Sequence, residues 1–166
     1  IIYELMAANA HMFIDPSMNY GSSVELYNPT NKSDGLQGLY ISDDASNLKQ
    51  HKIDYRIGTL PAKGYKVLWF DHYSKYAPTQ IDSKLDYDGG AIYISNEQGE
   101  VLAFQSYPEA ISRTSYARET DGGSSWGVTS TPTPGYSNKN SKFTYSRLDA
   151  PVVDTDACMF TSPFTV

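Results

Sequence analysis

The stretch "AIYISNEQGEVLAFQSY", residues 91–107, carries the clearest structural signal in the chain. At its start the residues alternate, so that Ile92 and Ile94 fall on one face of an extended chain while Tyr93 and Ser95 fall on the other. A Gly-containing turn at 96–100 then leads into a second run rich in apolar residues. The pattern predicts two strands joined as a hairpin.

Similar short runs occur along the rest of the chain. They are rich in β-branched and aromatic residues, are bounded by turn residues, and cover 1–8, 24–29, 38–44, 52–57 and 65–71. No stretch of ten or more residues keeps the 3.6-residue period of an amphipathic helix. We therefore predict an all-β fold, a sandwich or a barrel, with little helix.

The composition limits the classes of protein. The 166 residues suit one domain of ordinary size, and the single cysteine, Cys158, excludes an internal disulfide framework and a Cys-rich zinc site. A net charge of −6 disfavours nucleic acid as a partner, because that affinity rests on Lys and Arg. There is no apolar run long enough to span a membrane.

The Tyr-rich, weakly charged composition is common in secreted β-proteins. Because the chain starts at Ile1 rather than Met, we expect a processed or excised piece.

Four motifs occur in a characteristic order: "VELYNP" (24–29), "GLYISDD" (38–44), the turn "PAKGY" (61–65), and a Trp followed by Thr-Pro-Gly (126–135). In this order the chain over 1–138 resembles a lamin tail domain, of the branch found in large secreted or surface bacterial proteins. The resemblance implies an immunoglobulin-like β-sandwich and a non-catalytic module, often one of several in its parent chain. Nuclear members of the family bind proteins and DNA, but the acidity of this chain departs from them.

Several residues are expected to have structural roles. We expect Trp69 to be the large core aromatic, and Pro29 to mark the end of a strand. Trp126 should pack as a last strand, near 126–130, completes the sandwich. Pro134 and Gly135 should then stop further pairing, because proline lacks an N–H and glycine permits a sharp exit.

This interpretation divides the chain into three parts. Residues 1–138 form the sandwich domain, and residues 139–146 are a linker. Residues 147–166 are the truncated start of a following β-sandwich module, or else a tail packed on the first domain.

No catalytic group can be assembled from the sequence, and we expect neither enzyme activity nor a cofactor. The histidines are separated, without a second metal-ligating residue at a suitable spacing. Asp43 and Asp44 are weak candidates for binding a metal, with a solvated turn as the alternative.

The expected function is binding. The segment 70–80 places His72, Tyr73 and Tyr76 in a loop, where recognition residues often lie. The partner would be an unknown protein or glycan, and neighbouring domains of a secreted or cell-surface protein would lie alongside. One alternative is a carbohydrate-binding module that uses exposed Tyr73, Tyr76 and Tyr87; another is DNA binding by analogy with nuclear lamins, disfavoured by the acidity.

Overall fold

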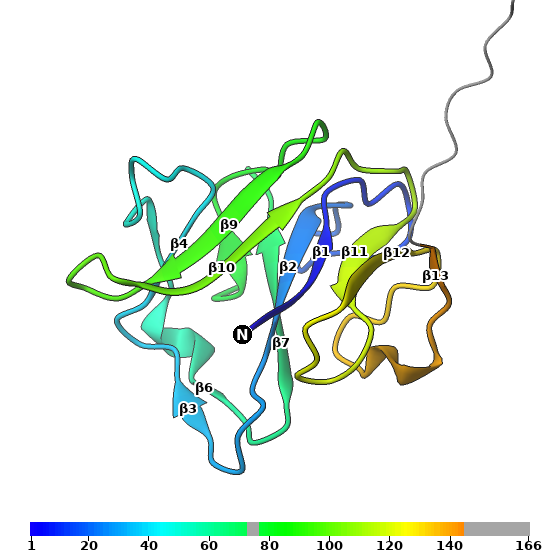
Figure 1. Cartoon of the computed structure of the whole chain (residues 1–166). Helices are drawn as coiled ribbons and strands as arrows, with labels where there is room; N and C mark the ends of the chain where they lie inside the picture. The colour runs from blue at the N-terminus through cyan, green and yellow to red at the C-terminus, as the bar shows by residue number, and fades with distance from the viewer. Residues whose placement is uncertain (73–76, 145–166) are drawn as a thin grey trace, which may run out of the picture.

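The computed structural model describes residues 1–72 and 77–144 (Figure 1). Strands dominate these ranges, and their only helices are two short 3-10 helices, η1 (Tyr55–Ile57) and η2 (Asn138–Asn140). The prediction of an all-β fold with little helix is therefore confirmed. None of the helices in the described ranges has the length and apolar character needed to cross a membrane.

The larger of two main sheets has seven strands, and β1 and β2 lie inside it. Its neighbouring strands are antiparallel except β7 and β8, which are parallel. In spatial order the strands are β13 (Phe143–Thr144), β12 (Trp126–Thr129), β11 (Ser115–Arg118), β1 (Ile2–Met6), β2 (Ser22–Tyr27), β7 (Tyr65–Phe70) and β8 (Gln80–Ile81).

The smaller sheet contains the hairpin predicted from residues 91–107. Its order is β10 (Val101–Tyr107), β9 (Gly90–Ser95), β4 (Tyr40–Ser42) and β5 (His51–Lys52). The turn between β9 and β10 closes with the Asn96 N–H donating to the Glu100 carbonyl at 3.1 Å, and Gly99 takes the left-handed φ of 81°. A separate two-stranded ribbon joins β3 (Asp34–Gly35) to β6 (Thr59–Leu60).

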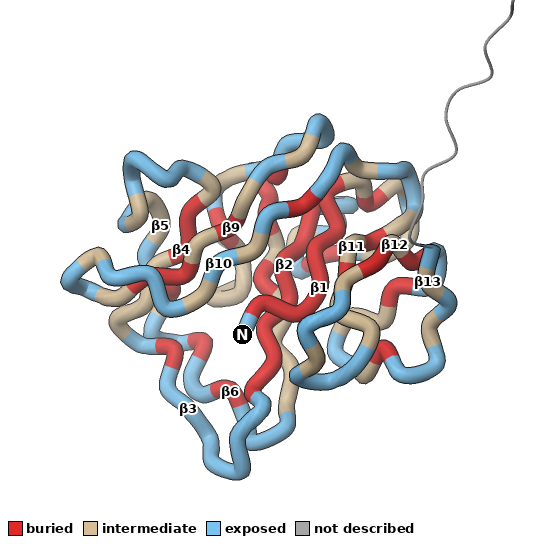
Figure 2. The backbone as a smooth tube through the Cα atoms, in the orientation of Figure 1, coloured by how far each residue is buried: buried red, intermediate tan, exposed pale blue. Residues whose placement is uncertain are grey.

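Both main sheets contribute to one hydrophobic core. Buried residues cluster where β1 and β2 run through the centre of the molecule (Figure 2). The core face of β2 carries Val24 and Leu26, and Ile92 and Ile94 of β9 belong to the same cluster. The burial of apolar side chains from two sheets against each other is the main stabilising contribution that this fold offers.

Strand β7 differs from its predicted orientation. Its core residues are Leu68 and Phe70, both almost fully buried, whereas Trp69 is only half-buried and lies outside the core cluster. Since successive residues of a strand point to opposite faces, Trp69 lies on the face turned away from the core. The expectation that Trp69 is the large core aromatic was wrong.

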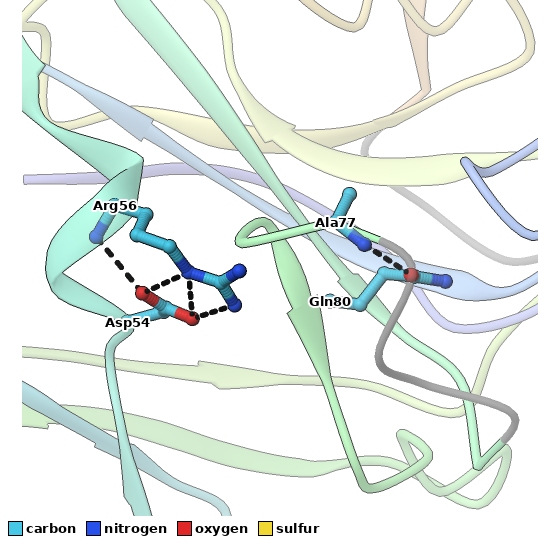
Figure 3. Close-up of polar contacts among 4 residues, drawn as sticks. All are labelled: Asp54, Arg56, Ala77 and Gln80. Atoms are coloured by element: carbon cyan, nitrogen blue, oxygen red, sulfur yellow. Dashed lines mark hydrogen bonds and ion pairs between the residues drawn. The ribbon is translucent and has the colours of Figure 1, made fainter.

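The strand predicted over 52–57 is also shorter than expected. Only His51–Lys52 pair as β5, and η1 replaces the rest because Asp54 caps it, accepting the Arg56 N–H at 2.8 Å. Figure 3 shows the Arg56 guanidinium folded back onto the same carboxylate, with Nε 3.0 Å from Oδ1. The figure also shows the turn before β8, where the Ala77 N–H donates to Gln80 Oε1 at 3.0 Å.

The chain does not leave the fold at the Thr-Pro segment. Trp126 does begin a strand, β12, but β13 returns to pair with it, Val128 opposite Thr144 and Thr129 opposite Phe143. Pro134 and Gly135 therefore interrupt the pairing without ending it, and the linker expected over 139–146 contributes a strand as far as Thr144. The remainder of that linker and the module or tail expected over 147–166 lie outside the described residues.

Candidate binding surface

Strand β10 displays exposed apolar side chains. Val101 is 46% exposed, Leu102 57% and Phe104 52%. The strand carries no charged residue along its seven positions. Scattered apolar residues are ordinary on a protein surface, but a group of them on one uncharged strand marks a place where another surface can bind.

The position of β10 in the sheet adds backbone groups to this surface. β9 pairs with β10 along one side, and no strand among the described residues pairs with its other side. The only irregularity is a shift of register between Val101 and Ala103. Such an edge leaves N–H and C=O groups available for a further strand, and the charges that often protect edges are missing from it.

A hollow lies beside this edge, at one end of the space between the two sheets. Its volume is about 330 Å³. The lining is largely apolar and includes Ile1, Leu26, Leu36, Leu60, Leu102 and Ala103. An apolar side chain approaching β10 therefore has a receptive concave site within reach.

The outer face of the smaller sheet continues the surface with aromatic rings. Phe104 contacts Tyr93, with ring centroids 5.0 Å apart and planes inclined at 44°. Farther along, the Lys52 ammonium lies 5.6 Å from the ring centroid of Tyr40 and 3.5 Å from a carboxylate oxygen of Glu97. We call Val101, Leu102, Phe104 and Tyr93 the β10 surface.

Of the binding residues predicted from the sequence, those that the structure describes lie outside the β10 surface. His72 is exposed, with Nδ1 3.6 Å from Oδ1 of the exposed Asp82. Tyr73 and Tyr76 are outside the described residues. Tyr87 is half exposed, and the Lys84 ammonium lies 4.4 Å from its ring centroid. The sequence already contains a signal for the β10 surface, since residues 101–107 are uncharged and mostly apolar. Periodicity alone does not show which strand forms an edge.

Asp43 and Asp44 belong to a local turn. Asp44 Oδ1 accepts hydrogen bonds from the N–H and the hydroxyl of Ser46 at 2.8 and 2.7 Å, and these bonds lower the pKa of Asp44. The backbone N–H of Asp43 donates to Gln50 Oε1. Among the described residues no three His, Cys, Asp or Glu side chains are grouped so that they could hold a metal ion together. The arrangement favours the solvated-turn alternative.

The Thr-Pro segment covers the outer face of the larger sheet. The Gly135 N–H donates to Glu25 Oε1 at 2.5 Å, and the Asn138 N–H donates to the Tyr3 hydroxyl at 2.8 Å. Asn138 itself is fully buried, and its side-chain amide donates to the Arg118 carbonyl at 3.0 Å. We call residues 131–138 the cover segment.

Beneath the cover segment lie two buried carboxylates that sequence analysis did not find. Glu4 of β1 pairs in register with Glu25 of β2, and the two residues are 5% and 2% exposed. Burial raises the pKa of Glu4. Burial and the neighbouring charge of Glu4 raise the pKa of Glu25 to about 9. Glu25 is therefore protonated at neutral pH, which removes the repulsion between the pair.

The residues with expected structural roles are distributed around this face and its edge. Trp126 is half-buried, packs against the core cluster and stacks on Tyr116 with centroids 5.1 Å apart. Pro29 is exposed and follows Asn28, whose side chain caps the turn by accepting the Thr30 N–H at 3.0 Å. Pro134 is partly buried within the cover segment.

Comparison of the chain with models of protein families, with curated proteins and with solved structures found no match. The candidate surface therefore rests on geometry and chemistry alone.

Proposed function

We propose that the chain is a non-catalytic interaction module of a larger secreted or surface-attached protein, and that it binds an extended segment of a partner protein along β10. The observation that carries this proposal is the group of exposed apolar residues, Val101, Leu102 and Phe104, on an uncharged strand whose second side has no paired strand within the described residues. Two packed sheets with a common core support the finer proposal of an immunoglobulin-like sandwich of the lamin tail type.

Addition of a strand explains how such a surface would recognise a peptide. The backbone of the peptide would hydrogen-bond to the open side of β10, and alternate side chains would face the hollow beside Leu102. Complete burial of one large aliphatic side chain contributes about 1.5–3 kcal/mol, from which the cost of ordering the peptide is subtracted. A few such anchors suit a specific but reversible contact.

The chemistry of the surface favours a protein over a glycan or a nucleic acid. Sugar rings stack on flat, coplanar aromatic faces, whereas the rings of Phe104 and Tyr93 are inclined at 44° and have aliphatic neighbours. The net charge of −6 opposes the approach of a phosphate backbone.

The proposal can be tested with a phage-displayed library of random linear peptides selected on the wild-type chain. We expect enriched peptides to be rich in apolar and β-branched residues. Leu102→Lys and Phe104→Ser should each weaken their binding about tenfold or more, equivalent to at least about 1.4 kcal/mol. Tyr55→Ser is the matched control, because it removes an exposed ring from η1, outside the β10 surface, and should leave binding unchanged.

Two results would contradict the proposal. One is the failure of the wild-type chain to select any peptide that Leu102→Lys weakens. The other is binding on a glycan array that Phe104→Ser abolishes, which would assign the same surface to carbohydrate. Thermal unfolding of each variant separates loss of binding from loss of fold.

A further inference from the structure

Three connections of the chain border another hollow, with a volume of about 270 Å³. They are the connection between β1 and β2, the residues that follow β7, and the connection between β8 and β9. The lining includes Asn19, Tyr20, Asp71, His72, Lys84 and Tyr87, none of which belongs to the β10 surface. Connections carried by a rigid β framework are a common place for recognition.

The connection between β1 and β2 supplies a fixed amide to this hollow. Asn19 Nδ2 donates to Asp71 Oδ2 at 3.1 Å. The backbone of the same residue is held by Asp15, whose Oδ1 accepts the Asn19 N–H at 3.0 Å. The amide is thereby oriented, and its oxygen, Oδ1, has no hydrogen-bond partner among the described residues, so it remains available as an acceptor.

Hydrogen-bond donors come from two other connections. Lys84 is exposed, and none of the described residues forms an ion pair with its ammonium group. The ammonium lies 4.4 Å from the ring centroid of Tyr87, and it keeps N–H groups for a ligand. His72 adds an exposed imidazole, of which only Nδ1 faces Asp82.

Two tyrosine rings add apolar surface to these polar groups. Tyr20 is 42% exposed and Tyr87 is 49% exposed. A tyrosine ring offers a large contact area at a low cost in conformational entropy. The hollow therefore combines aromatic walls with both donors and acceptors of hydrogen bonds.

The charges around the hollow distinguish between classes of ligand. Lys84 would repel a cation, and Asp71 would repel an anion. Asp15 lies within hydrogen-bonding reach of Asp71, and burial together with Asp71 raises the pKa of Asp15, so this pair carries less negative charge than two separate aspartates. A wholly apolar ligand would remove water from Asn19 and Lys84 without replacing its hydrogen bonds.

We propose that this hollow binds one ring of a neutral sugar. Sugar hydroxyl groups both donate and accept, so the same ring can bond to Asn19 Oδ1 and to the Lys84 ammonium while its C–H face packs on a tyrosine. The volume is slightly below the roughly 300–1,000 Å³ of pockets for drug-sized ligands, which suits a single ring. Tyr87 is among the tyrosines that the sequence predicts for a carbohydrate. Binding here is independent of peptide binding along β10.

The methyl glycosides of glucose, galactose and mannose are the probes for the test. Saturation-transfer NMR with the 166-residue chain at neutral pH detects weak complexes with a Kd of about 1 mM, the range expected for one ring. We expect saturation transfer to at least one of the three glycosides. Tyr87→Ser and Lys84→Met should each raise its Kd about fivefold or more.

Two matched controls remove the same kinds of side chain outside the hollow. Tyr55→Ser removes an exposed ring from η1, and Lys49→Met removes an ammonium group that lies 6.0 Å from the ring centroid of Tyr40. Both variants should bind the glycoside as the wild type does, and so should Phe104→Ser of the β10 surface. Thermal unfolding of every variant separates lost binding from a lost fold.

Three results would overturn the proposal. The first is the absence of saturation transfer to all three glycosides with the wild-type chain, and the second is binding that survives in both Tyr87→Ser and Lys84→Met. The third is tighter binding of glucosamine or glucuronate than of the neutral glycosides, which would assign the hollow to a charged ligand.

Discussion

Glu4 and Glu25 lie opposite each other on β1 and β2, and each has one carboxylate oxygen, Oε2, that is buried without a hydrogen-bond partner. Their remaining oxygens face the cover segment, where Gly135 supplies an N–H to Glu25. A carboxylate pair inside a sheet is compatible with folding only when at least one member holds a proton. The protonation of Glu25 therefore links the stability of the domain to pH.

The sign of this pH dependence follows from the pKa of Glu25, about 9 in the folded chain against an ordinary value of 4.5. Between these values the folded state holds a proton that the unfolded state has lost. The stabilising contribution is complete below pH 4.5 and falls as pH rises, by about 1.4 kcal/mol per pH unit at most, until the folded group also ionises.

Glu25→Gln should reduce this dependence and raise the free energy of unfolding at pH about 8, because the amide stays neutral and still offers an acceptor to Gly135. Urea unfolding of both proteins at a series of pH values measures the effect. Glu97→Gln, at an exposed position, serves as the control and should preserve the wild-type slope. Parallel slopes for Glu25→Gln and wild type would show that Glu25 titrates normally.

Gly135→Ala should lower the free energy of unfolding by about 1–2 kcal/mol. Gly135 has a φ of 87°, and an added Cβ would meet no atom within 4 Å, so backbone strain is the only penalty. Gly35→Ala is a matched control, since its Cβ is equally free and its φ is not left-handed. Chemical denaturation compares the two, and equal stabilities would contradict a strained cover segment.

Shortening the chain tests where the domain ends. A chain of residues 1–144 should stay folded, whereas a chain of residues 1–137 should lose cooperative unfolding or melt at a much lower temperature. The shorter chain lacks Asn138, which is buried and bonded to Tyr3 and Arg118, and it lacks β13. Thermal unfolding followed by circular dichroism compares the two shortened chains. A 1–137 chain as stable as the 1–144 chain would support the predicted end of the domain at residue 138.

Trp126→Ala should cost about 2 kcal/mol, less than the roughly 3–5 kcal/mol of a fully buried ring. Part of the side chain faces solvent, while the ring stacks on Tyr116 and its centroid lies 4.8 Å from the Arg118 guanidinium carbon. Trp126→Phe should recover part of the loss by keeping the stack. Unfolding in urea measures both variants, and a loss near zero would show that the contacts of Trp126 are dispensable.

The sequence predicts the parts of this fold that depend on local alternation. β9 follows from a period-two pattern with a single apolar face, and Val24 and Leu26 of β2 alternate in the same way. The hairpin follows from the Gly-containing turn at 96–100 between β9 and the apolar run of β10. The same reasoning fails at β7, because Val67, Leu68, Trp69 and Phe70 are apolar on both faces and a period alone cannot choose between them. Size favours Trp69 as the core residue, whereas the core contains Leu68 and Phe70.

The candidate sites are less accessible to sequence reasoning because distant segments build them. Without the cover segment, Glu4 and Glu25 would be ordinary surface residues. Nothing near either residue in the sequence indicates that Gly135 will donate a hydrogen bond to Glu25. Asp15 likewise reads as a polar loop residue, and only the fold places it beside Asp71. The Thr-Pro steps predict that strand pairing stops, but they only interrupt it, because β13 pairs with β12 after them. Local chemistry does not tell where the chain goes next.

The place of β1 within the larger sheet affects how the domain would bear mechanical load. β1 is paired on both sides, with β11 and β2, and the amino group of Ile1 donates to the Tyr27 carbonyl at 2.9 Å. β13, by contrast, is an edge strand held by two residue pairs. Under tension applied along the chain, β13 should therefore detach first, and β1 should stay paired until the sheet itself unfolds.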